Sequence, residues 1–135
     1  MKKVISISIV ATLMVVSGSA FSESGPGTVN YDIYSSTTLT KVGGASEFPG
    51  IVEPQVTKRG NFKMYNEFSG FETSVTYQDQ KGQRCTFTAG YKLNNIGPVY
   101  SSSVQKSPSN ANCSISLYGE KYGKPYRFTM SMSMY

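Results

Sequence analysis

Histidine and tryptophan are absent from this 135-residue chain, and only two of its residues are cysteines. Histidine is the side chain that most often acts as a general base, and it is the commonest metal ligand. If the two cysteines form a disulfide, no thiolate remains to act as a nucleophile or to bind zinc. The composition therefore predicts a protein that is not an enzyme and that has no catalytic residue, metal site or cofactor.

A long apolar run is missing as well. The chain opens with a methionine and two lysines, and the mainly apolar segment 4–16 follows them. This segment is shorter than the roughly 20 apolar residues that a membrane-spanning helix needs. Four small residues end it, an order typical of a secretory signal peptide. We expect residues 1–20 to be that peptide, with cleavage before Phe21. The mature protein is then a secreted or periplasmic bacterial protein without a transmembrane segment.

Removal of residues 1–20 from the 135-residue chain leaves 115 residues, the length of one domain. Residues 21–27 are small and polar and read as a flexible lead-in, so we assign a single β domain to residues 28–135. The formal net charge of +5 includes the two lysines of the signal peptide, which leaves about +3 for the mature chain. This charge is too small for a typical nucleic-acid-binding domain, and it permits an anionic partner of another kind.

Polar and apolar residues alternate along most of the mature chain, the pattern of strands with one buried and one exposed face. Five strands are predicted, near residues 28–40, 71–78, 84–93, 112–118 and 125–134. Asp79–Gly82 separates two of them and reads as a hairpin turn. Short strands joined by turns predict an all-β fold, a small single-domain β-sandwich or a partly closed barrel.

Two glycine-, proline- or serine-rich stretches interrupt the alternation. Residues 41–54 read as a long loop leading to a short strand near 51–57, and residues 94–112 as a second loop with an edge strand near 99–104. Long loops of this kind often carry binding residues.

The two cysteines, Cys85 and Cys113, fall on the apolar faces of their predicted strands. An even cysteine count in an oxidising compartment indicates a disulfide, and two cysteines allow one intramolecular pairing. The chain-entropy model assigns about 3.5 kcal/mol of stabilisation to a closed loop of this length.

Two short segments mix cations with tyrosines. They supply the predicted ligand-binding residues: Lys58, Arg59, Lys63 and Tyr65 in the first, and Lys121, Tyr122, Lys124 and Arg127 in the second. Cations attract phosphate and carboxylate groups, and aromatic rings stack on sugars or lie at a lipid interface. We therefore expect an exported, non-enzymatic binding protein whose partner is a phospholipid head group, an acidic glycan or an acidic protein surface. The competing interpretation is that these cations only keep strand ends soluble.

Two other functions stay open. The segment 116–122, SLYGEKY, resembles the loop with which periplasmic c-type lysozyme inhibitors, small exported β-barrels, plug an enzyme cleft. That resemblance covers seven residues and implies an inhibitor of a secreted hydrolase. The third possibility is a small hydrolase that uses a pair of carboxylates, although the spacing selects no pair. The carboxylates in question belong to Glu47, Glu53, Glu67, Glu72 and Asp79.

Overall fold

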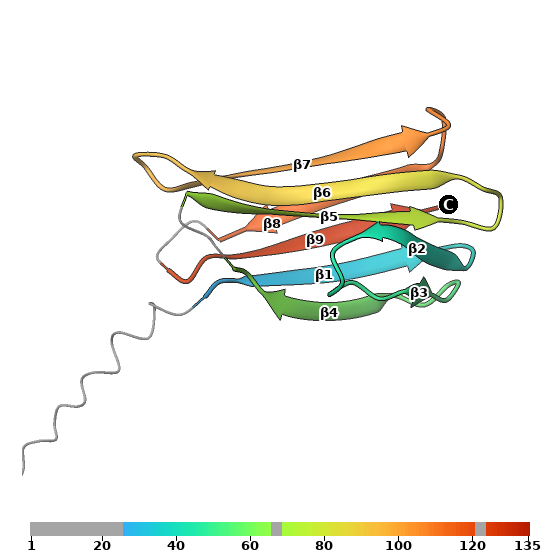
Figure 1. Cartoon of the computed structure of the whole chain (residues 1–135), viewed down its shortest axis with the longest axis horizontal. Helices are drawn as coiled ribbons and strands as arrows, with labels where there is room; N and C mark the ends of the chain where they lie inside the picture. Colours follow the sequence, from blue (N-terminus) through green and yellow to red (C-terminus); the bar gives the residue numbers. More distant parts are fainter. Residues whose placement is uncertain (1–25, 66–68, 121–123) are drawn as a thin grey trace, which may run out of the picture.

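The computed structural model describes residues 26–65, 69–120 and 124–135, and over these residues the chain forms nine β-strands and no helix (Figure 1). The predicted signal peptide and most of the lead-in lie outside the described residues. No helix within those ranges is long and apolar enough to cross a membrane. The strands are β1 (Thr28–Ser35), β2 (Leu39–Gly44), β3 (Ile51–Val52), β4 (Lys58–Lys63), β5 (Gly70–Gln78), β6 (Arg84–Leu93), β7 (Pro98–Ser107), β8 (Cys113–Gly119) and β9 (Arg127–Met134).

The strands form two sheets that pack face to face. One sheet has four strands in the order β4-β1-β9-β8, and the other has five in the order β3-β2-β5-β6-β7. Strands β1 and β9 are parallel, and the other pairs are antiparallel. The predicted β-sandwich is thereby confirmed, and the sheets do not close into a barrel.

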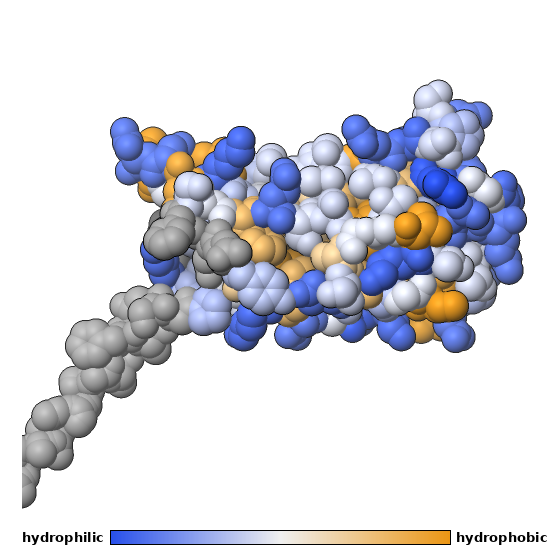
Figure 2. Space-filling view, viewed as in Figure 1, coloured by the Kyte–Doolittle hydropathy of each residue, from blue (hydrophilic) through white to orange (hydrophobic). Residues whose placement is uncertain are grey.

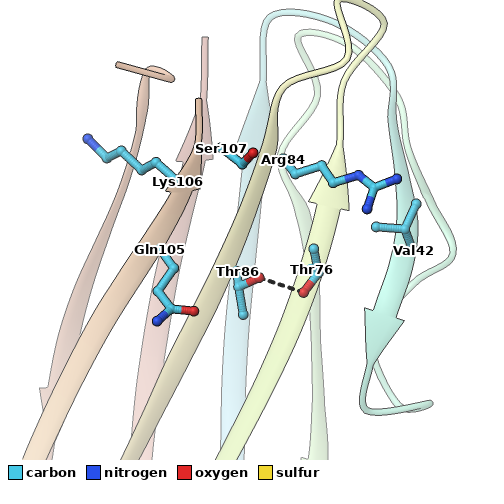
Figure 3. A pocket seen from close by; sticks show the side chains of 7 residues that line it. All are labelled: Val42, Thr76, Arg84, Thr86, Gln105, Lys106 and Ser107. Carbon is cyan, nitrogen blue, oxygen red and sulfur yellow. Dashed lines mark hydrogen bonds between the residues drawn. The ribbon is translucent and has the colours of Figure 1, made fainter. Parts of the chain in front are cut away.

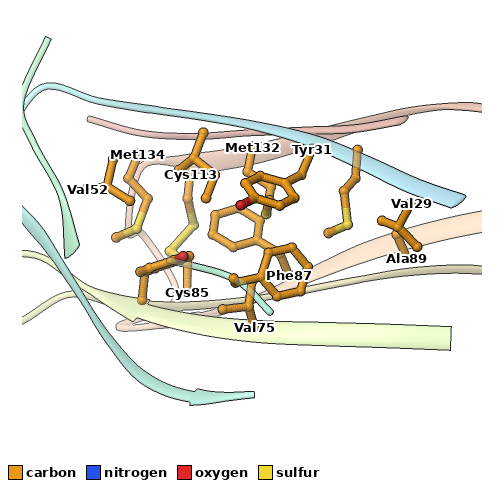
Figure 4. Packing of buried hydrophobic residues seen from close by; sticks show 14 of the residues in the cluster. Val29, Tyr31, Val52, Val75, Cys85, Phe87, Ala89, Cys113, Met132 and Met134 are labelled. Atoms are coloured by element: carbon orange, nitrogen blue, oxygen red, sulfur yellow. A yellow bond between two sulfur atoms is a disulfide. The ribbon is translucent and has the colours of Figure 1, made fainter. Parts of the chain in front are cut away.

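Alternation along the strands places one face of each sheet in a shared core. In β1 and β9 nearly every second residue is buried. Figure 4 shows Tyr31 and Met132 from the four-stranded sheet meeting Val75 and Phe87 from the five-stranded sheet. Strand β9 contributes three buried methionines, whose flexible side chains fill irregular gaps.

The disulfide between Cys85 and Cys113 is confirmed. Cys85 lies on β6 and Cys113 on β8, so the bond joins the two sheets covalently through the core, where both residues are buried. Asp79–Gly82 forms the predicted hairpin turn: Gly82 has a φ of 87° and its N–H donates to the carbonyl of Asp79.

The strands differ from the prediction in several places. The short strand expected near 51–57 is limited to Ile51–Val52, and β2 extends to Gly44, into the predicted loop 41–54. The expected strand 28–40 is two strands, because the chain turns at residues 36–38 and crosses from one sheet to the other. The edge strand predicted near 99–104 is longer, and spans Pro98–Ser107 in a region expected to be mostly loop. Strand β4 was not predicted. The inner face of β4 carries Gly60, so an apolar side chain is missing from the alternating pattern there. The ring of Tyr31 occupies the space that such a side chain would need.

Candidate functional site

The two predicted basic segments meet on the outer face of the four-stranded sheet. Strand β1 lies between β4 and β9, and Thr28 pairs with Lys63 on one side and with Arg127 on the other. Paired residues of neighbouring strands point to the same face, and Val29, next in β1, is buried. The three residues therefore form one row on the outer face. With strands about 4.8 Å apart, the Cα atoms of Lys63 and Arg127 are about 10 Å apart.

Three further rows continue this surface, which we call the polar face. Its side chains are amides, hydroxyls, tyrosines and charged groups. The rows, from β4 toward β8, are Asn61, Asn30, Thr129 and Tyr118; then Arg59, Asp32, Ser131 and Ser116; and then Tyr34, Ser133 and Ser114. Tyr118 is 71% exposed, so its ring is available for stacking or for contact with an interface.

The cations of the polar face make weak, exposed interactions. The ammonium group of Lys63 donates to Thr28 Oγ1 at 3.2 Å. A guanidinium nitrogen of Arg127 lies 3.5 Å from a carboxylate oxygen of Glu120, and both side chains are about half exposed. Exposed pairs of this kind contribute little to stability. An incoming phosphate or carboxylate can therefore replace these partners at low cost.

The remaining predicted binding residues lie in different places. Lys58 pairs with the buried Ile33, so it points to the opposite side of β4 from Arg59 and is exposed at the sheet edge. Lys124 is exposed in the connection between β8 and β9. Lys121 and Tyr122 lie outside the described residues.

Tyr65 follows β4, and its hydroxyl donates a hydrogen bond to the carboxylate of Glu47. This bond is the main cause that lowers the pKa of the Glu47 carboxyl group and raises the pKa of the Tyr65 hydroxyl. Tyr65 is nevertheless 58% exposed. Its ring is therefore held at the surface by a loop of the five-stranded sheet, beyond the end of β4.

The loop suggested for hydrolase inhibition is described only in part. Ser116 to Gly119 belong to strand β8, with Ser116 and Tyr118 on the polar face. Glu120 follows the strand, and the next three residues are not described. An inhibitory loop at this position stays a prediction.

The carboxylates considered for hydrolysis have separate surroundings. Asp79 is buried and accepts hydrogen bonds from the backbone N–H groups of Lys81 and Gln83, each at 2.9 Å, so it holds a turn. Glu47 is bonded to Tyr65, and Glu72 lies on the outer face of the five-stranded sheet opposite Gly90. Glu67 lies outside the described residues. Among those described, no three His, Cys, Asp or Glu side chains are placed to hold a metal ion.

Sequence reasoning missed two open hollows on the outer face of the five-stranded sheet. One, of about 760 Å³, is bordered by Thr76, Thr86 and Arg84, and the two threonine hydroxyls are 2.7 Å apart (Figure 3). The other, of about 580 Å³, lies over Gly70 and Gly90, which leave the sheet without side chains there. The alternating hydroxyl residues of β5 and β6 were the available signal for this polar surface.

Comparison with known proteins places the chain in no family. No family model matches it, and no curated protein matches it. Among solved structures, the fold is similar to that of the lipid binding protein Nakanori, with a TM-score of 0.48 and 10% sequence identity over 86% of this chain and 75% of that chain. A likeness of this degree carries no argument about function.

Proposed function

We propose that this chain is a secreted or periplasmic, non-catalytic binding protein that recognises an anionic ligand on its polar face. The observation that carries the proposal is the position of Lys63 and Arg127 on either side of Thr28. The cations come from segments far apart in the sequence, and β1 brings them into one row. The buried disulfide supports export, because such bonds persist in oxidising compartments.

The row suits a phosphate or carboxylate group. Two long cationic side chains flank a short hydroxyl side chain, so both can lean over Thr28 and contact one anion from opposite sides. The next row adds the amides of Asn61 and Asn30, which can donate to neighbouring oxygens, and the exposed ring of Tyr118. These groups fit the three candidate partners: a phospholipid head group, an acidic glycan and an acidic protein surface.

The test is binding of the mature, oxidised protein, residues 21–135, to three probes: phosphatidylserine vesicles, immobilised heparin and an acidic protein column. The double variant Lys63→Ala and Arg127→Ala removes both cations of the row. We expect binding to the favoured probe to weaken about tenfold or more and to depend less on salt, because fewer charges take part.

The matched control is the double variant Lys81→Ala and Lys106→Ala. It lowers the net charge by the same amount at exposed positions near the opposite end of the sandwich. The control should bind as the unmodified protein does. Equal losses for both double variants would show that net charge, and not the polar face, governs binding.

A further inference from the structure

Among the described residues, the most exposed large apolar side chain is at the tip of the β6–β7 hairpin. Ile96 is 95% exposed, and Val99, at the start of β7, is 52% exposed. Figure 2 shows apolar atoms at this tip beside hydrophilic ones, and Figure 1 shows the tip projecting from one end of the sandwich. A single exposed apolar residue is ordinary, so a role in binding has to be argued from the residues around it.

The backbone around Ile96 is bonded within the turn. The side-chain oxygen of Asn94 accepts hydrogen bonds from the N–H groups of Ile96, at 2.8 Å, and Gly97, at 3.1 Å. The N–H of Asn94 donates to the carbonyl of Gly97 at 3.0 Å. Moving a backbone N–H or C=O group from water into an apolar medium costs free energy if the group has no hydrogen-bond partner there. Because these donors are already paired, the tip can enter an apolar medium at a lower cost, in a conformation that is already formed.

Cations collect at the same end of the sandwich, which we call the basic end. Its described cations are Lys63, Lys92, Lys124 and Arg127. Two contacts hold the sheets together at this end. The hydroxyl of Tyr100 in β7 donates to the carbonyl of Glu120 just after β8, and the rings of Tyr91 and Tyr126 are 5.2 Å apart.

The positive charge of this end is largely free. Lys92 pairs with Val99 across the hairpin, directly behind the exposed tip. Within the described ranges no salt bridge joins Lys63, Lys92 or Lys124 to a carboxylate, and Arg127 is paired with Glu120. The exposed ring of Tyr65 lies just beyond Lys63, and tyrosine favours the boundary between water and lipid.

We propose that the basic end docks on an anionic phospholipid bilayer, with Ile96 entering the interface and the surrounding cations contacting head groups. This rests on the proposed function and selects one of its three partners. An acidic glycan can satisfy the cations but offers no hydrocarbon to a side chain that projects beyond them, and an acidic protein surface would need an apolar pocket at that one point. A bilayer offers both, because anionic head groups overlie hydrocarbon.

The absence of tryptophan from the chain permits a direct test. The variant Ile96→Trp places a single tryptophan at the tip. On addition of vesicles of phosphatidylserine and phosphatidylcholine, its emission should shift to shorter wavelength and be quenched by brominated lipid. The control is Val56→Trp, because Val56 is 60% exposed between β3 and β4, at the opposite end. An unchanged Ile96→Trp spectrum with vesicle-bound protein would overturn the insertion.

Affinity gives the second readout. Ile96→Ser should weaken vesicle binding about tenfold, the scale expected for one lost aliphatic anchor, whereas Ile96→Leu and Val56→Ser should leave it within about twofold. Equal binding by Ile96→Ser overturns the anchor. If the unmodified protein binds heparin but not vesicles, the membrane inference fails and the proposed function stands. If it binds none of the three probes, both fail.

Discussion

The ring of Tyr100 in β7 lies against Gly119 in β8 and occupies the space that a side chain at position 119 would need. The two residues belong to different sheets, and the hydroxyl of Tyr100 also donates to the carbonyl of the residue that follows Gly119. The absence of a side chain at position 119 therefore lets the sheets approach closely at the basic end.

Substitution of Gly119 by alanine should destabilise the protein. The added methyl group overlaps the ring of Tyr100, and overpacking of this kind costs about 1–3 kcal/mol. Denaturant unfolding measures the loss. The control is Gly50→Ala, because a Cβ at Gly50 meets no atom within 4 Å, and its effect should stay within about 0.5 kcal/mol. Equal stability of both variants would show that the ring moves aside freely.

Removal of the disulfide should have a larger effect. Cys85 and Cys113 are 28 residues apart, and the chain-entropy model assigns about 3.5 kcal/mol to the loop that they close. The double variant Cys85→Ala and Cys113→Ala should melt more than about 10 °C lower. Thermal unfolding followed by circular dichroism measures the difference, with the oxidised parent in reductant-free buffer as reference. Coincident melting curves would contradict a stabilising role.

Stability should fall in alkaline solution. Burial raises the pKa of Tyr100 to about 12 and raises that of Tyr77 still further, whereas an unfolded chain ionises its tyrosines near pH 10. Because the folded protein holds these hydroxyl groups neutral, their contribution is complete below about pH 10 and is lost as the pH rises through the folded values. Melting temperatures measured between pH 8 and pH 12 should decline from about pH 10 upward.

The variant Tyr77→Phe tests the two contributions of the Tyr77 hydroxyl, its hydrogen bond and its ionisation at high pH. The variant loses the hydrogen bond from Tyr77 to the carbonyl of Pro49, 2.7 Å long, so it should be about 1 kcal/mol less stable at pH 8. It should also decline less steeply above pH 10, because one buried ionisable group is gone. An unchanged alkaline slope would assign the decline to other groups.

Neighbouring cations of β4 should differ in their effect on binding. Arg59 points to the polar face and Lys58 to the opposite side, so Arg59→Ala should lower the salt concentration that elutes the protein from heparin more than Lys58→Ala does. Both variants lose one charge at exposed positions, so each serves as the control for the other. Indistinguishable elution would indicate that ligands do not use the polar face.

The fold was largely predictable because burial leaves a local mark. In residues 71–78 and 84–93 the alternation is regular, and both strands form where predicted. The sequence of β4 lacks this alternation, because the core beside Gly60 is filled by the ring of Tyr31 from another strand. Lys63 and Arg127 lie in one row because both pair with Thr28. Pairing between segments so far apart in the sequence cannot be predicted from the residues of either segment alone.

The hairpin tip was missed for a different reason. The sequence predicts that residues 94–112 are mostly irregular loop, but residues 98–107 of this stretch form strand β7. Asn94 and Gly97 are residues that favour turns, and an isoleucine between them was the available indication of an exposed apolar tip.

The parallel pairing of β1 with β9 has a consequence for how the molecule assembles. Strand β1 emerges early during synthesis, but its partner β9 is complete only when residue 134 has been made. Until then the edge of β1 that pairs with β9 lacks its backbone partner, although β4 can already pair with the other edge. Strands β1 and β4 can pair earlier, but the four-stranded sheet is completed only when β9 is available to join β1 to β8. Folding must bring together residues 99 positions apart, such as Thr28 and Arg127, and non-local pairing of this kind is typical of slowly folding domains.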